Sequence, residues 1–390
     1  MKQETRVNHP PAVELSPDNR PLVAPIYQSV KFEFADTAET DRFLHGERPG
    51  FYYSRQANPT LRQLELLLSE LQGQEACLLT ASGAGAVGMC LTSLCKAGDH
   101  ILAFIESYGP TRHIIQRILG RYGVTHTLLP IEDRAGIERV LATTPTRLVM
   151  FESPTNPVTK IADVAHLVGT AHAHGALVVM DNTFAGFHNH GGMGIDVHVH
   201  SLTKYASGHG DVMGGAILAS ERLIRSIRQD VNTLGATLDP HAAFLLQRGM
   251  RTYFLRYERQ CANALQVARF LATHPRVRRV FYPGLPDHPQ HALAARQMRD
   301  FGAVVSFDLD GGLDHGSRFA DALQLFSTTP SLGSTESLVM PGRLLGGREF
   351  TPEQRVHSAI GPGTVRLSIG IEAATDLLAD LAQALAASFG

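Results

Sequence analysis

Ala176-Leu177-Val178-Val179-Met180-Asp181 and Val197-His198-Val199-His200-Ser201-Leu202-Thr203-Lys204 are two largely apolar runs that each lead into a charged residue. Continuous apolar runs bounded by polar residues are typical of buried strands in a parallel sheet. Ligands of open α/β sheets bind beyond the carboxyl ends of the strands. The two runs therefore predict that an acid, Asp181, and an amine, Lys204, face one cleft.

This acid and amine, with hydroxyls at Ser201 and Thr203, match what pyridoxal phosphate (PLP) requires. The cofactor needs a lysine for a Schiff base, a carboxylate for its pyridinium nitrogen and hydrogen-bond donors for its phosphate. Taken singly, a lysine after a strand is usually a solvated loop residue, and an aspartate there is most often a helix N-cap. The interpretation gains weight only from other phosphate and ring contacts.

Length and composition are those of an ordinary globular enzyme. The chain has 390 residues, which predicts two domains. Hydrophobic residues make up 44% and charged residues 18%, as is common in soluble enzymes. The net charge of −2 suggests neither nucleic acid nor an anionic membrane as a partner. No apolar stretch is long enough to span a bilayer and no secretory h-region is present, so we expect a cytoplasmic protein.

Cysteine usage agrees with this location. Cys77, Cys90, Cys95 and Cys261 form no Cys-x-x-Cys pair, and all but Cys95 lie in apolar surroundings. Reduced core thiols in a cytoplasmic protein are the default for such a pattern. No nearby sequence supports a catalytic thiol.

The pattern predicts three parts. Residues 1–58 are rich in proline and turn signals, which indicates an extended arm suited to contacts with a neighbouring subunit. Residues 59–240 alternate strand-like and helical segments, which predicts a large α/β domain with a mostly parallel sheet flanked by helices. Residues 241–390 predict a smaller α+β domain, joined to the first by one long helix over 241–271.

The expected elements follow from apolar periodicity. In the large domain we expect helices over 60–71 and 163–173 and strands over 76–80, 101–105, 148–151, 176–180, 197–200 and 216–219. In the smaller domain we expect strands over 304–307 and 365–369 and a final helix over 373–387.

A glycine-rich loop supports a rival interpretation. Gly83, Gly85 and Gly88 spell Gly-x-Gly-x-x-Gly between a strand and a helix, and Glu106 ends the next strand, as in dinucleotide-binding proteins. An NAD-dependent oxidoreductase is therefore an alternative. The same loop serves any phosphate, because N–H groups at a helix N-terminus point at the anion, and tight strand-to-helix packing also requires glycine. The sequence supports an anion site better than it supports NAD.

Two His-x-His pairs raise a third possibility, a metallohydrolase. His188 and His190 form one pair, and His198 and His200 form the other. No set of acids completes the ligands, and the alternation over 197–200 equally fits one face of a strand. We therefore expect core or surface histidines and no metal site.

Three further residues have chemistry that suits a ring, a phosphate or a carboxylate. Tyr108 lies just past a strand end and can stack on a cofactor ring, although packing on a neighbouring helix is the simpler explanation. Arg55 in the arm is either a bidentate phosphate ligand or a solvated arginine. Arg366 lies within an apolar strand pattern, where its charge needs a substrate carboxylate or a buried acid as partner.

Together these segments resemble the Cys/Met-metabolism family of PLP enzymes, from about residue 25 to the C-terminus. That family includes cystathionine γ-synthase, cystathionine γ-lyase, cystathionine β-lyase, methionine γ-lyase and the homoserine-ester sulfhydrylases. The motifs that carry the resemblance are Tyr53-Ser54-Arg55, Asn58-Pro59-Thr60, Ser82-Gly83, Tyr108-Gly109, Glu152-Ser153-Pro154-Thr155-Asn156-Pro157, Asp181-Asn182-Thr183-Phe184, His200-Ser201-Leu202-Thr203-Lys204-Tyr205, Gly208-His209-Gly210-Asp211-Val212-Met213-Gly214-Gly215, Ser331-Leu332-Gly333 and Arg366-Leu367-Ser368-Ile369-Gly370. The resemblance implies fold type I of the PLP-dependent transferases, similar to aspartate aminotransferase.

The resemblance also implies the site. The catalytic residues would be Lys204, which holds PLP as an internal aldimine, Asp181, which pairs with the pyridinium nitrogen, and Tyr108, which stacks on the ring. The phosphate would be bound by Gly83, Ala84, Ser201 and Thr203, with Tyr53 and Arg55 from the neighbouring subunit. The substrate carboxylate would be held by Arg366, Ser331 and Asn156. Each active site would need a dimer, and the family is typically a tetramer built from two such dimers.

The implied reaction is elimination or replacement at Cγ of a homocysteine- or homoserine-type amino acid such as cystathionine or methionine. Lys204 would take the Cα proton, the ring would store the charge as a quinonoid, and a second deprotonation at Cβ would expel the γ-substituent. Hydrolysis then gives 2-oxobutanoate and ammonia. We favour elimination; the alternatives are γ-replacement, as in cystathionine γ-synthase or an O-acyl-homoserine sulfhydrylase, β-elimination from cystathionine, and a non-sulfur leaving group.

Several positions depart from the better-known branches of the family. Pro330 stands where the γ-synthases and γ-lyases of cystathionine usually have a glutamate that contacts the distal amine. Gln56 replaces a second arginine that is common in bacterial γ-synthases, and Pro110 replaces the cysteine usual in methionine γ-lyases. Ala84 stands where methionine is common. These changes bear on the substrate rather than on the cofactor.

Overall fold

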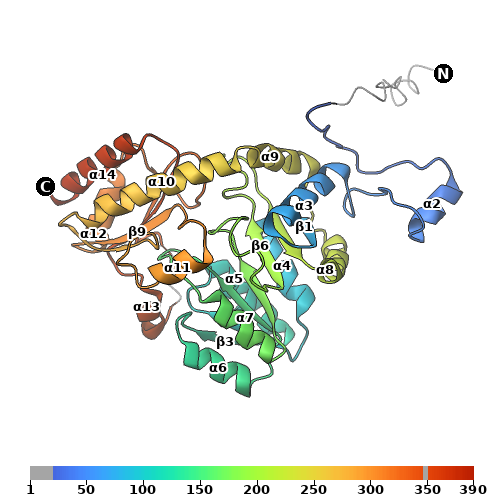
Figure 1. Ribbon diagram of the computed structural model, residues 1–390, viewed down its shortest axis with the longest axis horizontal. Coiled ribbons are helices and arrows are strands. Elements are labelled where there is room, and N and C mark those ends of the chain that lie inside the picture. Colours follow the sequence, from blue (N-terminus) through green and yellow to red (C-terminus); the bar gives the residue numbers. More distant parts are fainter. Residues whose placement is uncertain (1–20, 346–349) are drawn as a thin grey trace.

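A computed structural model describes residues 21–345 and 350–390. Two sheets, one within residues 76–219 and the other within residues 277–368, form the body of the molecule. The described part of the arm extends away from this body and carries α2 (Thr37–Leu44), whereas the C-terminus lies at the opposite end (Figure 1). Residues 1–20 of the predicted arm lie outside the described residues, and the domain boundaries at 58 and 240 stay predictions.

The first sheet is mostly parallel, as predicted. Its order is β1-β7-β6-β5-β4-β2-β3, and only β7 runs antiparallel to its neighbours. The strands are β1 (Ala76–Thr80), β2 (His100–Phe104), β3 (Thr125–Leu129), β4 (Leu148–Glu152), β5 (Leu177–Asp181), β6 (Val197–Ser201) and β7 (Gly215–Ala219). The prediction missed β3, because this edge strand is partly exposed and carries polar side chains.

Helices cover both faces of this sheet. They are α3 (Pro59–Gln72), α4 (Gly83–Leu94), α5 (Gly109–His113), the π-helix η1 (Ile114–Ile118), the 3₁₀-helix η2 (Leu119–Tyr122), α6 (Arg134–Thr143), α7 (Val164–Ala173) and α8 (Glu221–Leu234). Successive strand residues face opposite cores: Val179 packs with α4 and α8, whereas Val178 and Met180 pack with α6 and α7. Burial on both faces explains why the strands are continuously apolar.

Helix α3 shows how local sequence sets an element's ends. The side chain of Asn58 accepts a hydrogen bond from the N–H of Thr60 at 2.9 Å, and Pro59 opens the helix. Gly73 closes it in the left-handed conformation, with φ of +72°. Leu64 and Leu68 are fully buried on the inner face.

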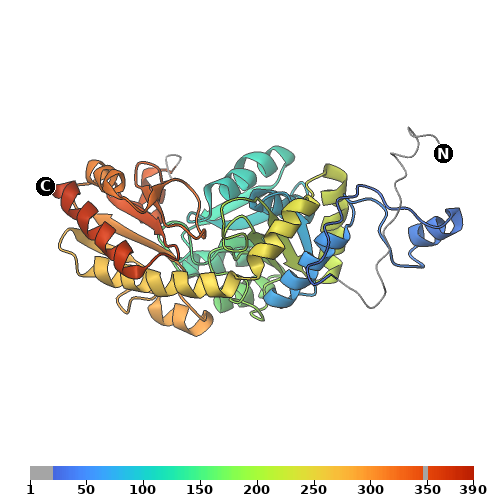
Figure 2. The same cartoon turned by 90° about the horizontal axis from the view of Figure 1, so that it is seen from above.

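The predicted single helix over 241–271 is wrong. The structure has two helices, α9 (Pro240–Met250) and α10 (Tyr253–Ala272). Arg256 donates from one Nη to the carbonyl of Gly249 at 2.8 Å and from the other to the carbonyl of Tyr205 at 2.9 Å. These bonds engage the end of α9 with the loop after β6, a tertiary contact that periodicity does not reveal. Helix α10 continues beside the second sheet (Figure 2).

The second sheet is mixed and smaller, with the order β10-β11-β12-β9-β8. Its strands are β8 (Val277–Phe281), β9 (Val304–Leu309), β10 (Ser327–Thr328), β11 (Leu338–Pro341) and β12 (Thr364–Ser368), and the helices beside it are α11 (His291–Gln297), α12 (Leu313–Ala322), α13 (Pro352–Ser358) and α14 (Ala374–Phe389). The two predicted strands and the final helix are therefore present, with ends shifted by at most two residues. Among the described helices, none is both long and apolar enough to cross a membrane.

Candidate active site

A cavity of about 480 Å³ opens at the carboxyl ends of β4, β5 and β6, with a second wall from the C-terminal sheet. Ten of the twelve predicted site residues line it: Gly83, Ala84, Tyr108, Asn156, Asp181, Ser201, Thr203, Lys204, Ser331 and Arg366. The remaining two, Tyr53 and Arg55, are not among its lining residues.

Lys204 lies three residues beyond β6 and reaches across to the other wall. Its Nζ donates to the hydroxyl of Ser331 at 2.8 Å. Burial, and secondly the positive charge of Arg366, lower the pKa of Lys204, while Asp181 opposes the shift. The amine is therefore easier to deprotonate than a solvated lysine.

Asp181, the last residue of β5, is fixed by Thr183. One carboxylate oxygen, Oδ1, accepts from the N–H of Thr183 at 3.0 Å and from its hydroxyl at 2.6 Å. Burial raises the pKa of Asp181, and the bonds from Thr183 and the charge of Lys204 counteract that rise. The Thr183 hydroxyl also accepts from the N–H of Ser201 at 2.8 Å, so it joins the ends of β5 and β6.

The start of α4 has the features of an anion cradle. The Ser82 hydroxyl caps the N–H of Gly85 at 3.0 Å, and no hydrogen bond within the described chain uses the N–H groups of Gly83 and Ala84. A Cβ on Gly83 would lie 2.5 Å from Cβ of Ser201, so only glycine allows this close approach. Free N–H groups at a helix N-terminus beside a serine hydroxyl suit a phosphate.

Arg366 on β12 has the features of a carboxylate ligand. Its two Nη groups donate to Oδ1 of Asn156 at 3.1 Å and to the carbonyl of Ser331 at 2.7 Å. Its Nε is buried and has no hydrogen-bond partner among the described residues. Burial lowers the pKa of Arg366 to about 10. An unpaired donor on a buried cation calls for an anion, and a bound carboxylate would supply one.

Sequence reasoning gave no role to two residues of this site, Thr183 and Glu152. Glu152 ends β4, lines the cavity and is buried. Both residues lie in motifs of the family resemblance, Glu152 at the end of an apolar run and Thr183 two residues after the run that ends at Asp181. That position was the signal that could have found them, because the carboxyl ends of neighbouring parallel strands converge.

Tyr53 and Arg55, the two predicted site residues of the arm, do not line this cavity. The guanidinium of Arg55 lies over the ring of Tyr53, 5.5 Å from its centroid, and Tyr53 is 39% exposed. Neither residue contributes to the cavity of its own chain.

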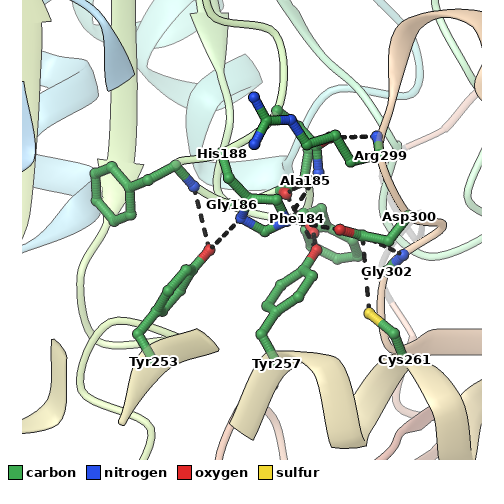
Figure 3. A network of polar contacts seen from close by, with 12 residues as sticks. Phe184, Ala185, Gly186, His188, Tyr253, Tyr257, Cys261, Arg299, Asp300 and Gly302 are labelled. Atoms are coloured by element: carbon green, nitrogen blue, oxygen red, sulfur yellow. Dashed lines mark hydrogen bonds and ion pairs between the residues drawn. The ribbon is translucent and has the colours of Figure 1, made fainter. Parts of the chain in front are cut away.

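The histidines of the two His-x-His pairs contact neighbouring side chains of the protein. His188 Nε2 lies 2.6 Å from a carboxylate oxygen of Asp300, and the Tyr253 hydroxyl lies on the other side of the ring (Figure 3). Burial lowers the pKa of His190 to about 4 and that of His198 to about 3. Within residues 21–345 and 350–390, no cluster of three or more His, Cys, Asp or Glu side chains could hold a metal.

All four cysteines are free thiols. Cys77 and Cys90 are buried, and burial raises the pKa of Cys95 to about 12, so a reactive thiolate is not expected there. The apolar surroundings expected for Cys261 are interrupted by Asp300, whose carboxylate accepts from its Sγ at 3.7 Å (Figure 3).

Residues 12–386 match the family of Cys/Met metabolism PLP-dependent enzymes. The chain belongs to this family. It is similar to L-methionine gamma-lyase of Pseudomonas putida, with 43% identity over 371 residues that cover 94% of this chain and 93% of the relative. It is also similar to cystathionine gamma-synthase 1, chloroplastic, of Arabidopsis thaliana, with 39% identity over 94% of this chain and 65% of the relative.

Solved structures of the family share the fold. Cystathionine gamma synthase from Xanthomonas oryzae pv. oryzae in complex with cystathionine matches with a TM-score of 0.89 and 35% identity, over 94% of both chains. Cystathionine gamma-lyase from Lactobacillus plantarum complexed with L-serine matches with a TM-score of 0.88 and 35% identity, over all of both chains. The fold is therefore that of fold-type I PLP enzymes, as the resemblance implied.

The cavity of this PLP-dependent enzyme fits its cofactor. It offers a lysine, a carboxylate at the neighbouring strand end and an anion cradle beside Gly83, which together are the groups that PLP requires. Family membership rules out the NAD-dependent alternative. The structure adds a reason, because Glu106 is not available for a ribose: it accepts from Lys160 Nζ at 2.9 Å and from the N–H of Ile131 at 3.1 Å.

Proposed function

We propose that this PLP-dependent enzyme catalyses γ-elimination from a thioether amino acid such as methionine. Methionine and water would give methanethiol, 2-oxobutanoate and ammonia. The observation that carries the proposal is the apolar character of the cavity wall contributed by Val158, Pro330, Leu345, Phe350 and Ile360.

Each acidic side chain that lines the described part of the cavity already has a hydrogen-bond or ion-pair partner within the protein. Among the described lining residues these are Glu106, Glu152 and Asp181. Glu106 pairs with Lys160, Glu152 accepts two backbone N–H groups, and Asp181 accepts from Thr183. The distal ammonium of cystathionine would therefore lack a partner in this region, whereas a methylthio group would be buried against apolar atoms.

We assign the roles of the site residues as the family resemblance implies. Arg366 binds the substrate carboxylate through its unpaired Nε, with Asn156 and Ser331 holding the guanidinium. Gly83, Ala84, Ser201 and Thr203 bind the cofactor phosphate, Asp181 faces the pyridine nitrogen and Tyr108 stacks on the ring. PLP, when bound, supplies the electron sink that makes the substrate's Cα and Cβ protons acidic.

Lys204 moves the protons of the reaction. Burial and Arg366 lower its pKa, so its Nζ loses its proton more readily than a solvated lysine and can accept the Cα proton as a base. The Ser331 hydroxyl, 2.8 Å from Nζ, holds the amine at one position in the cavity. Removal of a second proton from Cβ allows the bond between Cγ and sulfur to break, and the sulfur leaves with the bonding electrons as a thiolate.

We also propose that a neighbouring subunit completes the site. Tyr53 and Arg55 carry the chemistry of a ring and phosphate contact but do not line the cavity of their own chain. Their place on an extended arm suits a shared active site in a dimer, two of which would form the tetramer. A cytoplasmic location without nucleic-acid or membrane partners is part of the same proposal.

The proposal is tested by incubating the purified holoenzyme separately with L-methionine and L-cystathionine and identifying the keto acid and thiol by mass spectrometry. We expect 2-oxobutanoate and methanethiol from methionine, with methionine the better substrate. Pyruvate from cystathionine would replace our assignment with β-elimination. Product formation only from an O-acyl-homoserine with added thiol would indicate γ-replacement.

A further inference from the structure

Glu152 is a buried carboxyl group that the proposed reaction does not use. The parallel pairing of β4 with β5 places it opposite Asp181, the last residue of the neighbouring strand. Paired residues of neighbouring parallel strands point to the same face of a sheet, and both side chains line the cavity. Glu152 is only 6% exposed, so two carboxyl groups lie side by side in a protected part of the site.

Each oxygen of Glu152 holds a different loop. Oε2 accepts from the N–H of Tyr108, in the loop after β2, at 2.9 Å. Oε1 accepts from the N–H of Asn156, in the loop after β4, at 2.9 Å. Asn156 in turn accepts from Arg366 at 3.1 Å. One side chain therefore connects the aromatic residue of the ring site with the residue that supports the carboxylate site.

The charges around Glu152 differ from those around Asp181. Burial and the neighbouring Asp181 raise the pKa of Glu152 to about 8, against the two N–H donors and Arg112 on α5. Asp181 instead faces Lys204 and the Thr183 donors, which favour its ionised form. Two adjacent buried carboxyl groups do not readily ionise together. The surroundings of Asp181 favour its ionised form more than those of Glu152 do.

We propose that Glu152 is a positioning residue that holds Tyr108 and Asn156 at a fixed spacing in the cavity, beside the carboxylate of Asp181. Its link to substrate binding rests on the proposed function, because it depends on Arg366 and Asn156 holding the substrate carboxylate. Its link to the cofactor rests on family membership.

The test compares purified holoenzymes of the wild type, Glu152→Gln and Glu152→Asp. The amide of Gln has one acceptor oxygen and places an NH₂ group against the second backbone N–H, so one loop loses its partner. Asp keeps an ionisable group but is one methylene shorter. The readouts are KM and kcat for L-methionine, the dissociation constant of glycine measured from the visible absorbance of the bound cofactor, and the pH midpoint of that absorbance.

For Glu152→Gln we expect the KM for methionine and the dissociation constant of glycine to rise about tenfold, with a smaller change in kcat. The absorbance midpoint should fall by about one pH unit, because the carboxyl group of Glu152 can ionise at alkaline pH and then stabilise protonated groups of the cofactor, whereas the amide cannot. Glu152→Asp should weaken glycine binding but keep a midpoint close to that of the wild type.

Asp380→Asn is the matched control. Asp380 is also a buried carboxylate that accepts two backbone N–H groups, those of Gln324 at 2.9 Å and Leu325 at 2.8 Å, and it does not line the cavity. Its replacement should lower the unfolding temperature without changing glycine binding or the absorbance midpoint.

Wild-type values of glycine affinity and absorbance midpoint in Glu152→Gln would overturn the proposal, as would equal shifts in Asp380→Asn. If Glu152→Gln does not fold, unchanged glycine binding in Glu152→Asp would overturn it as well. A wild-type enzyme that forms no keto acid from methionine would refute the proposed function alone, since glycine binding and the absorbance midpoint still report on Glu152.

Discussion

The Nζ of Lys204 lies 2.8 Å from the hydroxyl of Ser331, although 127 residues separate them in the sequence. Lys204 follows β6 of the first sheet, and Ser331 precedes β11 of the second. The backbone of Ser331 has φ of +114°, a region in which non-glycine residues are strained. The position of the amine therefore depends on a contact between the loop after β6 and the loop before β11, and a strained residue makes that contact.

Two substitutions of Ser331 distinguish the effect of its hydroxyl group on activity from the effect of its strained backbone on stability. We expect Ser331→Ala and Ser331→Gly to lose a similar part of kcat, roughly tenfold, because both remove the hydrogen bond to Lys204. Ser331→Gly should be about 1 kcal/mol more stable than Ser331→Ala, because glycine adopts this φ without strain. Steady-state kinetics and urea unfolding of the two variants measure these effects. Equal stabilities would show that the positive φ carries no cost.

Replacing Lys204 tests its attachment to the cofactor. Borohydride reduction of the wild type should add the mass of reduced PLP to the peptide that contains Lys204. Lys204→Ala should show no such addition and no measurable turnover, because no amine remains at that position. Lys204→Arg serves as a control that keeps the positive charge. A reduced, cofactor-labelled lysine in the Ala variant would refute the assignment.

Arg366→Lys should raise the KM for the amino-acid substrate about 100-fold. A lysine keeps the charge but loses the planar fork, whose Nη groups bind Asn156 and the Ser331 carbonyl and whose Nε is left for the proposed substrate carboxylate. The change should fall mainly on KM rather than kcat, because the contact is with a group that does not react. Arg269→Lys on the exposed side of α10 is the control. A KM like that of the wild type would place the carboxylate elsewhere.

Pro330→Glu should shift the substrate preference toward cystathionine. Pro330 is exposed at the cavity wall, and a carboxylate there could pair with the distal ammonium of cystathionine. We expect the ratio of kcat/KM for cystathionine to that for methionine to rise roughly tenfold. Pro330→Gln controls for the loss of proline and should not raise the ratio. An unchanged ratio in Pro330→Glu would show that the distal group lies away from this position.

Acid should destabilise the protein through its buried histidines. Burial lowers the folded-state pKa of His198 to about 3, below the ordinary value of 6.5, so its stability contribution is present above pH 6.5 and is lost as the pH falls from there toward 3. Between pH 7 and pH 5 the loss should amount to about 2 kcal/mol for this histidine.

Urea unfolding of His198→Gln at both pH values measures this contribution, since glutamine cannot be protonated. The variant should lose less stability on acidification than the wild type. His241→Gln, at an exposed position on α9, should leave the pH dependence unchanged. An unchanged pH dependence in His198→Gln would contradict the prediction.

The sequence by itself determined most strands of the first sheet and one side of the site. Strands that are buried on both faces must be continuously apolar, so the run that ends at Asp181 and the run before Lys204 could be recognised without a structure. Because the carboxyl ends of parallel strands meet at one edge, the same pattern predicted that the two residues share a cleft, and the cavity contains both. Arg366 was recognisable for a related reason, since a charge within an apolar strand needs a partner.

Only the tertiary structure decided what lies opposite these residues. The break between α9 and α10 accompanies the contact of Arg256 with the loop after β6, and the partner of Lys204 depends on how the second sheet packs against the first. The pairing of Glu152 with Asp181 depends on strand order and register, which no local pattern encodes. Hydrophobic periodicity reports which face of an element is buried but not which distant element covers it, and that choice placed Ser331, Arg366 and Glu152 around the site.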